Sequence, residues 1–86
     1  MNFMDSSDQR HTAPTCCYIV VEITGTWWID IEGKPFGPCE DREDAITCAF
    51  KLIEMFGDRT RPAAVYAPDE NGRTRLIWKG QLEEDA

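Results

Sequence analysis

Two short segments near the start of the chain carry the hydrophobic pattern of β-strands. Residues 16–24, CCYIVVEIT, are rich in Ile and Val, which is typical of a strand. In residues 27–32, WWIDIE, apolar and polar side chains alternate, so Trp27, Ile29 and Ile31 share one face. We therefore expect an antiparallel pair of strands with this face toward the core.

The loop between these two strands decides which side chains face the core. A two-residue loop, Gly25-Thr26, would place Glu22 on the core face. A three-residue loop over residues 24–26 pairs only apolar positions, namely Ile23 with Trp27, Val21 with Ile29, and Ile19 with Ile31. Because a shift of one residue moves every side chain to the other face, the sequence favours the three-residue loop. Trp27 is then predicted to point inward and Trp28 outward.

A helix is predicted between Asp41 and Gly57. Asp41 is the expected N-cap, Asp44 lies three residues later in the first turn, and Gly57 is expected to end the helix. Apolar residues recur at helical spacing: Ala45, Ile46, Ala49, Phe50, Ile53 and Phe56. The preceding residues 33–41 are rich in Gly and Pro, which predicts a turn or a short edge segment.

The last part of the chain predicts a β-hairpin. Residues 61–67, RPAAVYA, and 74–80, TRLIWKG, are typical of strands, and Asn71-Gly72 between them is a strong hairpin turn signal. A two-residue turn there places Tyr66 opposite Ile77. The face predicted to point inward consists of Val65, Ala67, Leu76 and Trp78.

These elements predict an α+β fold. Their order, β-β-α-β-β, indicates a two-layer sandwich with one helix packed on a four-stranded antiparallel sheet. The chain of 86 residues is long enough for one domain, which we assign to residues 16–80. Residues 1–15 are predicted to be a flexible N-terminal arm and residues 81–86 an acidic C-terminal tail.

One helix covers only one face of such a sheet, so the other face is predicted to be exposed. Exposed aromatic surface is typical of interaction sites, and Trp and Tyr are often central to binding energy. We therefore predict a protein-binding surface that is both aromatic and acidic. Its residues are Tyr18, Val20, Glu22, Trp28, Asp30, Glu32, Tyr66 and Ile77.

The charge distribution limits the kinds of partner. The net charge is −7, and an acidic chain is repelled by nucleic acid and by anionic membranes. Residues 59–79 carry five basic and two acidic side chains, a local charge of +3 against −10 for the remainder. Such asymmetry suits head-to-tail or two-fold pairing between protein surfaces as well as it suits nucleic acid. We expect neither direct nucleic-acid binding nor a membrane segment, and we expect a cytoplasmic protein whose cysteines stay reduced.

The residues capable of metal binding or catalysis do not form a recognisable motif. Cys16, Cys17, Cys39 and Cys48 contain no C-x-x-C pair, and the one histidine, His11, falls in the predicted arm. Asp30 and Glu32 are expected to be solvated. The sequence therefore predicts no metal site, no cofactor and no catalytic residue, and hence no enzyme.

The pattern W-x-I-D, then Gly33, then EDREDAITCAFKLIE and AVYAPDENGRTRLIWKG, resembles small bacterial and phage domains of unknown function. The resemblance covers about residues 17–80 and implies the β-β-α-β-β layout but no activity. This chain departs from the pattern at Glu40-Asp41, where a Phe-x-Thr-like helix entry is usual. In size, charge and layout the chain is also similar to small acidic phage-encoded inhibitors of host defence complexes.

Two functions follow as hypotheses. The first is a non-enzymatic protein-binding module that acts through the exposed sheet face, with a second copy of the chain as one such partner. The alternative is an acidic phage-type inhibitor that occupies a nucleic-acid-binding cleft of a host defence complex.

Overall fold

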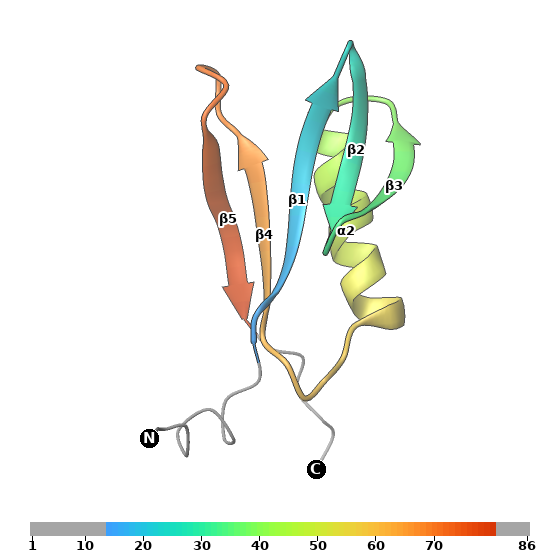
Figure 1. The fold of residues 1–86 in the computed structure, drawn as a ribbon, viewed down its shortest axis with the longest axis vertical. Helices are drawn as coiled ribbons and strands as arrows, with labels where there is room; N and C mark the ends of the chain where they lie inside the picture. Colours follow the sequence, from blue (N-terminus) through green and yellow to red (C-terminus); the bar gives the residue numbers. More distant parts are fainter. Residues whose placement is uncertain (1–13, 81–86) are drawn as a thin grey trace.

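A computed structural model describes residues 14–80, in which one helix packs on a five-stranded sheet (Figure 1). In chain order the elements are β1 (Cys16–Ile23), β2 (Thr26–Ile31), β3 (Lys34–Cys39), α2 (Arg42–Phe56), β4 (Ala63–Pro68) and β5 (Thr74–Gly80). The α+β class with a single helix is confirmed. Apart from Pro14 and Thr15, the predicted arm and the predicted tail lie outside the described residues. Between residues 14 and 80, no helix is long and apolar enough to cross a membrane.

The predicted four-stranded antiparallel sheet is wrong in strand number and in direction. The strand order is β3-β2-β1-β4-β5, so the Gly- and Pro-rich segment before the helix forms a strand of its own. Proline lacks a backbone N–H, and it is therefore tolerated mainly at a sheet edge. β3 occupies such an edge, which explains how it accommodates Pro35 and Pro38.

β1 and β4 run parallel in the middle of the sheet. Cys16–Ile19 pair with Ala63–Tyr66, and the Cys16 amide donates to the Pro62 carbonyl at 2.9 Å. A parallel pair needs a long crossover connection, which β2, β3 and α2 together provide. The sequence shows the strands but not this crossover, because β4 could equally have paired with either edge.

The predicted three-residue loop between β1 and β2 is also wrong. The observed register pairs Ile23 with Thr26 and Val20 with Ile29, which leaves the two-residue loop Thr24-Gly25. Thr24 has φ 48° and Gly25 has φ 82°. Positive φ at both central residues is the requirement of a type I′ hairpin turn. A β-branched residue rarely adopts positive φ. The presence of Thr24 therefore does not predict a type I′ turn at this position.

The change of register reverses the faces of β1 but not those of β2. Tyr18 and Val20 are predicted to be on the exposed face, yet they are only 5% and 1% exposed and belong to the core. Ile29 is buried and Trp27 packs against the core, as predicted for β2. Trp28 lies on the opposite side, next to Val21 in the register.

The predicted helix is confirmed at both ends. The Asp41 side chain caps the N-terminus by accepting from the Asp44 amide at 2.8 Å, and Glu43 and Asp44 lie in the first turn, where the helix dipole favours negative charge. The helix ends at Phe56, and the Gly57 amide donates to the Ile53 carbonyl at 2.9 Å.

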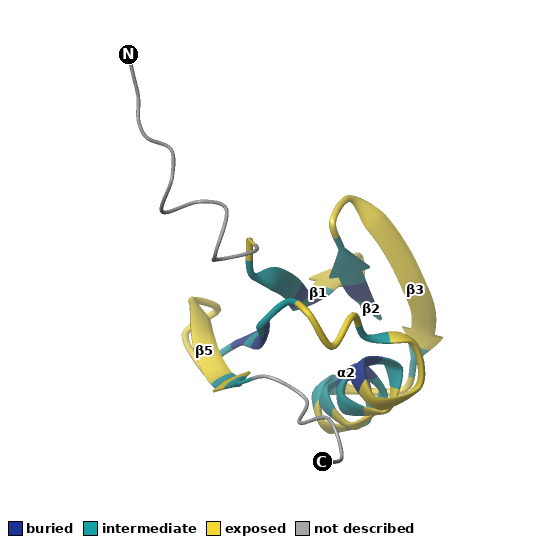
Figure 2. Ribbon diagram, turned by 90° about the horizontal axis from the view of Figure 1, so that it is seen from below, coloured by how far each residue is buried: buried dark blue, intermediate teal, exposed yellow. Residues whose placement is uncertain are grey.

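The core lies between α2 and the helix-facing side of β1, β2 and β4 (Figure 2). Its buried side chains are Tyr18, Val20, Ile29, Ala45, Ala49, Ile53, Ala63, Val65 and Ala67. Ala45 and Ala49 are fully buried, and such small side chains let the helix approach the sheet closely. Phe50 extends this core sideways, because its ring meets that of Trp78 edge-on at 5.4 Å between centroids. Phe56, predicted to be on the same stripe, is instead 71% exposed.

The β4–β5 hairpin differs from its prediction by a bulge. Val65 pairs with Trp78 as expected, but the next pair is Tyr66 with Leu76, so Ile77 is the extra residue of the bulge. Leu76, predicted to face inward, therefore shares the side of Tyr66 and is 53% exposed. The predicted two-residue turn is replaced by a longer one, closed where the Asp69 amide donates to the Arg73 carbonyl.

Two isoleucines in one hairpin test this register. Ile29→Ala removes a side chain that is 1% exposed and leaves a cavity, so we expect a loss of about 2–5 kcal/mol in the free energy of unfolding. The matched variant Ile23→Ala affects a side chain that is 57% exposed and should cost about 0.5 kcal/mol or less. Urea denaturation of both variants measures the difference. Equal losses, or a larger loss for Ile23→Ala, would contradict the observed register.

Candidate functional site

The side of the sheet opposite α2 is uncovered by any described residue (Figure 2). The register identifies the side chains that share this side, since paired residues of adjacent strands point the same way. They are Ile19, Val21 and Ile23 of β1, Trp28 of β2, Pro35 of β3, Tyr66 of β4 and Leu76 of β5. We call this set the open sheet face. It is apolar across every strand, which is unusual for a surface exposed to water.

Trp28 is the anchor of the open sheet face. Its ring lies against the backbone of β3, because a Cβ added at Gly37 would lie 3.2 Å from Trp28 Cε3. Gly37 has φ 139°, so glycine is required there on two grounds. On either side of Trp28 are two shallow hollows, both lined in addition by Ile23 and Pro35. A rigid aromatic side chain between hollows is well suited to be packed against by another protein.

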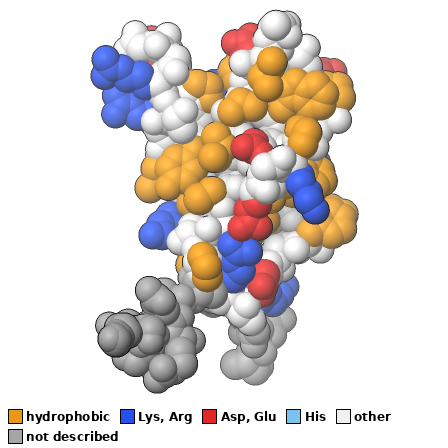
Figure 3. Space-filling model, in the orientation of Figure 1, with side chains coloured by type: hydrophobic (Ala, Val, Ile, Leu, Met, Phe, Trp, Pro, Cys, Tyr) orange, Lys and Arg blue, Asp and Glu red, His pale blue; other side chains and the backbone are white. Residues whose placement is uncertain are grey.

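Charged groups on the open sheet face differ in sign between its two halves. Asp30 of β2 lies on this side, opposite Ile19 and Pro35, and its carboxylate accepts from the Gly33 amide at 3.0 Å. Lys79 of β5 lies opposite Ala64 on the same side. Figure 3 shows this face with its hydrophobic side chains gathered in patches over the β1–β2 and β4–β5 hairpins. The open sheet face is therefore apolar, with a negative charge on β2 and a positive charge on β5.

The structure keeps some of the predicted surface residues together and separates others. Trp28, Asp30 and Tyr66 lie on the open sheet face. Glu22 pairs with Trp27 and so belongs to the helix side at an exposed strand end. Glu32 is in the β2–β3 turn, with φ 52°. Ile77, the bulge residue, is 40% exposed, and Tyr18 and Val20 are in the core.

The surface predicted from the sequence did not include Ile19, Val21, Ile23, Pro35 and Leu76. The first three follow directly from the type I′ turn, since a two-residue loop at Thr24-Gly25 turns the odd-numbered side chains of β1 outward. The Gly in the second loop position was the available signal. Leu76 depends on the bulge in β5, for which the sequence offers no signal that we recognise.

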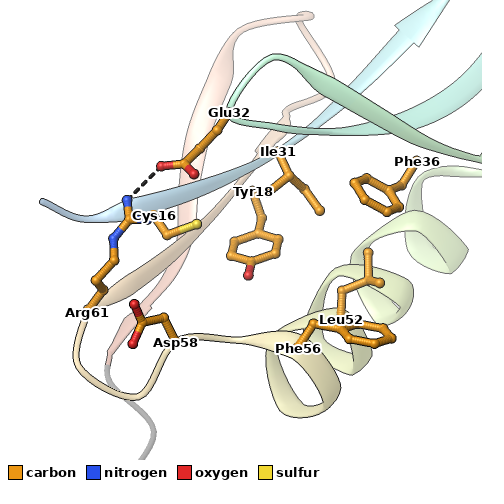
Figure 4. Close-up of a pocket in the computed structure, with 9 residues that line it drawn as sticks. All are labelled: Cys16, Tyr18, Ile31, Glu32, Phe36, Leu52, Phe56, Asp58 and Arg61. Carbon is orange, nitrogen blue, oxygen red and sulfur yellow. Dashed lines mark hydrogen bonds and ion pairs between the residues drawn. The ribbon is translucent and has the colours of Figure 1, made fainter.

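A cavity of about 390 Å³ opens on the helix side of the sheet (Figure 4). It is lined by Cys16, Tyr18, Ile31, Glu32, Phe36, Leu52, Phe56, Asp58 and Arg61. Burial, followed by the neighbouring Cys16, raises the pKa of Tyr18 to about 12, so its hydroxyl stays protonated at neutral pH. With a neutral phenol and mainly apolar walls, the cavity is suited to an apolar group.

The polar rim of this cavity is an ion pair. The Arg61 guanidinium donates to Glu32 Oε2 at 2.6 Å and, through Nε, to the Pro14 carbonyl at 2.8 Å. The contact with Arg61 lowers the pKa of Glu32 below its ordinary value. This ion pair connects the β2–β3 turn to the segment that precedes β4, and it balances the negative charge of Glu32.

A third group of side chains lies near the start of α2. One ligand atom from each of Cys39, Asp44 and Cys48 can be chosen such that all three lie within 4.8 Å of one another. Burial and the adjacent Cys48 raise the pKa of the Cys39 thiol to about 11. The four described cysteines are free thiols. Of the residues described here, these are the ones whose grouping could hold a metal ion.

Comparisons with models of known protein families, with curated protein sequences and with solved structures gave no match.

The rim of the cavity predicts a pH-dependent contribution to stability. Because Arg61 lowers the pKa of Glu32, the ion pair stabilises the fold at pH values above the unfolded glutamate pKa and is lost as pH falls through the folded value. Glu32→Gln should therefore be less stable than the unaltered protein at neutral pH, by the small amount typical of a solvent-exposed pair, and the difference should vanish in acid. Urea denaturation over a pH series measures this.

Glu70→Gln is the control, because Glu70 forms none of the ion pairs found within residues 14–80. A Glu32→Gln deficit that persists unchanged in acid would contradict the ion-pair explanation.

Proposed function

We propose that this protein is a small non-enzymatic protein-binding module and that its open sheet face is the binding surface. The observation that carries the proposal is the uncovered apolar side chains on all five strands of the sheet. Keeping Ile23 and Leu76 more than half exposed to water is unfavourable, and covering them on binding would release that cost. The proposal retains the expectation of a reducing, cytoplasmic setting for the free thiols.

The partner favoured by the charge pattern is a second copy of the chain. Two sheets pack face to face about 10 Å apart, with their strand directions within about 30° of each other. A two-fold axis parallel to the strands and near the β1–β4 seam would place β2 of one copy over β5 of the other. Asp30 would then approach Lys79 of its partner at both ends of the interface. The apolar residues of the two faces would meet between these charges, and the helices would lie outside.

An isologous interface of this kind explains the mixed charge along the chain. If equivalent strands of the two copies lay over each other, like charges would face and repel. About the two-fold axis, the mainly basic β4–β5 half of one copy instead faces the mainly acidic β1–β2 half of the other. Charge complementarity of this type contributes more to specificity than to affinity. The affinity would come from Trp28, Tyr66 and the aliphatic side chains around them.

The test is the oligomeric state of a matched pair of variants. Leu76→Glu places a carboxylate inside the proposed interface, on the strand that would face β2 of the partner, where it would lose its hydration, so we expect at least a tenfold weaker dimer. Met55→Glu makes the same change in charge on α2, at a side chain that is 69% exposed and away from the sheet, and should leave association unchanged. Sedimentation velocity at rising protein concentration measures both.

A monomer at every concentration would contradict the proposal of self-association. So would equal weakening by both variants, because a general effect of added negative charge would then account for it.

A further inference from the structure

Cys39, Asp44 and Cys48 meet although the sequence contains no familiar metal-binding spacing. Asp44 and Cys48 are four residues apart on α2, so they lie on the same face of the helix. Cys39 is the last residue of β3, and only two residues separate it from the helix. The N-terminal turn of α2 therefore folds the strand end back onto the helix. It brings two thiols and one carboxylate together in the pattern C-x4-D-x3-C.

We propose that Cys39, Asp44 and Cys48 bind one Zn²⁺ ion. Thiolate and carboxylate are both zinc ligands, with bonds of about 2.3 Å to sulfur and 2.0–2.2 Å to oxygen. Ligand atoms around a tetrahedral ion would then lie about 3.5–3.8 Å apart. The three ligand atoms already lie within 4.8 Å of one another, so side-chain rotations that move them by about 1 Å would close the site. This inference concerns the helix side of the molecule and does not depend on the open sheet face.

The surroundings of the cluster favour a bound ion. The Glu40 amide donates to Asp44 Oδ2 at 3.0 Å, which orients the carboxylate and leaves Oδ1 for the metal. All three ligand residues are half-buried, so a bound ion would be partly shielded from water. Two thiolates and a carboxylate would give the zinc complex a charge of −1, and Lys51, which lines the adjoining cavity, offers a compensating cation.

The adjoining cavity supplies the fourth coordination position. It has a volume of about 320 Å³ and is lined by both thiol residues together with Pro38, Lys51 and Leu52. This cavity is open to solvent, so a water molecule on its Cys39–Cys48 wall could complete a tetrahedral zinc site. The site is thus of the open kind, with three protein ligands and an exchangeable position.

Cobalt substitution tests the proposal. The full chain, kept reduced with a phosphine and stripped of metal with a chelator, is titrated with Co²⁺. We expect a thiolate-to-cobalt absorption band that saturates at one ion per chain and is lost on adding Zn²⁺, which binds such sites more tightly. Cys39→Ser and Cys48→Ser should abolish the band, and Asp44→Asn should weaken cobalt binding at least tenfold. Cys17→Ser, which alters a thiol of β1, should leave the band unchanged.

Two further measurements separate metal binding from folding. Zn²⁺ should raise the midpoint of thermal unfolding of the unaltered protein and of Cys17→Ser, but not that of Cys39→Ser. Should a serine variant fail to fold, alkylation of the unaltered protein replaces it. Zn²⁺ should then protect Cys39 and Cys48, but not Cys17, from iodoacetamide.

An unaltered chain without a thiolate–cobalt band would overturn the proposal. So would a band that survives in folded Cys39→Ser and Cys48→Ser proteins, since the ion would then be held by other residues.

Discussion

The packing of α2 across the seam between β1 and β4 holds this structure together. The sheet consists of an antiparallel unit, β3-β2-β1, and a hairpin, β4-β5, and only the short parallel pairing of Cys16–Ile19 with Ala63–Tyr66 joins them. The buried helix residues Ala45, Ala49 and Ile53 pack with core residues from both units. Without that helix the seam would consist of four paired positions, and parallel pairing alone is a weak constraint.

Within residues 14–80, α2 covers only one side of the five-stranded sheet. The helix side holds most of the buried residues, whereas on the other side Ile23 and Leu76 remain more than half exposed to water. Partial exposure of Trp28 and Tyr66 is compatible with a folded chain only because the helix side supplies enough burial. The open sheet face and the Cys39–Asp44–Cys48 cluster lie on opposite sides of the sheet, so the binding proposed at one would leave the other accessible.

The sequence predicts those features of the fold that are set by local interactions. The helix has a capping aspartate, acidic residues in its first turn and an apolar stripe, and it occurs where it is predicted, from Arg42 to Phe56. The strict alternation in β2 assigns Trp27 and Trp28 to opposite faces in any register, and that assignment holds. The candidate site was predicted less well. Trp28, Asp30 and Tyr66 lie on the predicted surface, but Tyr18 and Val20 are buried.

The sequence by itself determined the type of every element except β3, together with the helix ends and the inward face of β2, because propensity, capping and periodicity act within a few residues. Only the tertiary structure decided the partner of each strand, the register of β1 and the meeting of Cys39 with Asp44 and Cys48. Thr24 accepts positive φ because the resulting turn buries Val20 against Ile29. β1 pairs with β4 because α2 returns the chain to the edge of β1 that β2 leaves unpaired. In both cases the burial of side chains against residues distant in the sequence outweighs a local conformational preference. The residues of one short segment therefore cannot predict the outcome.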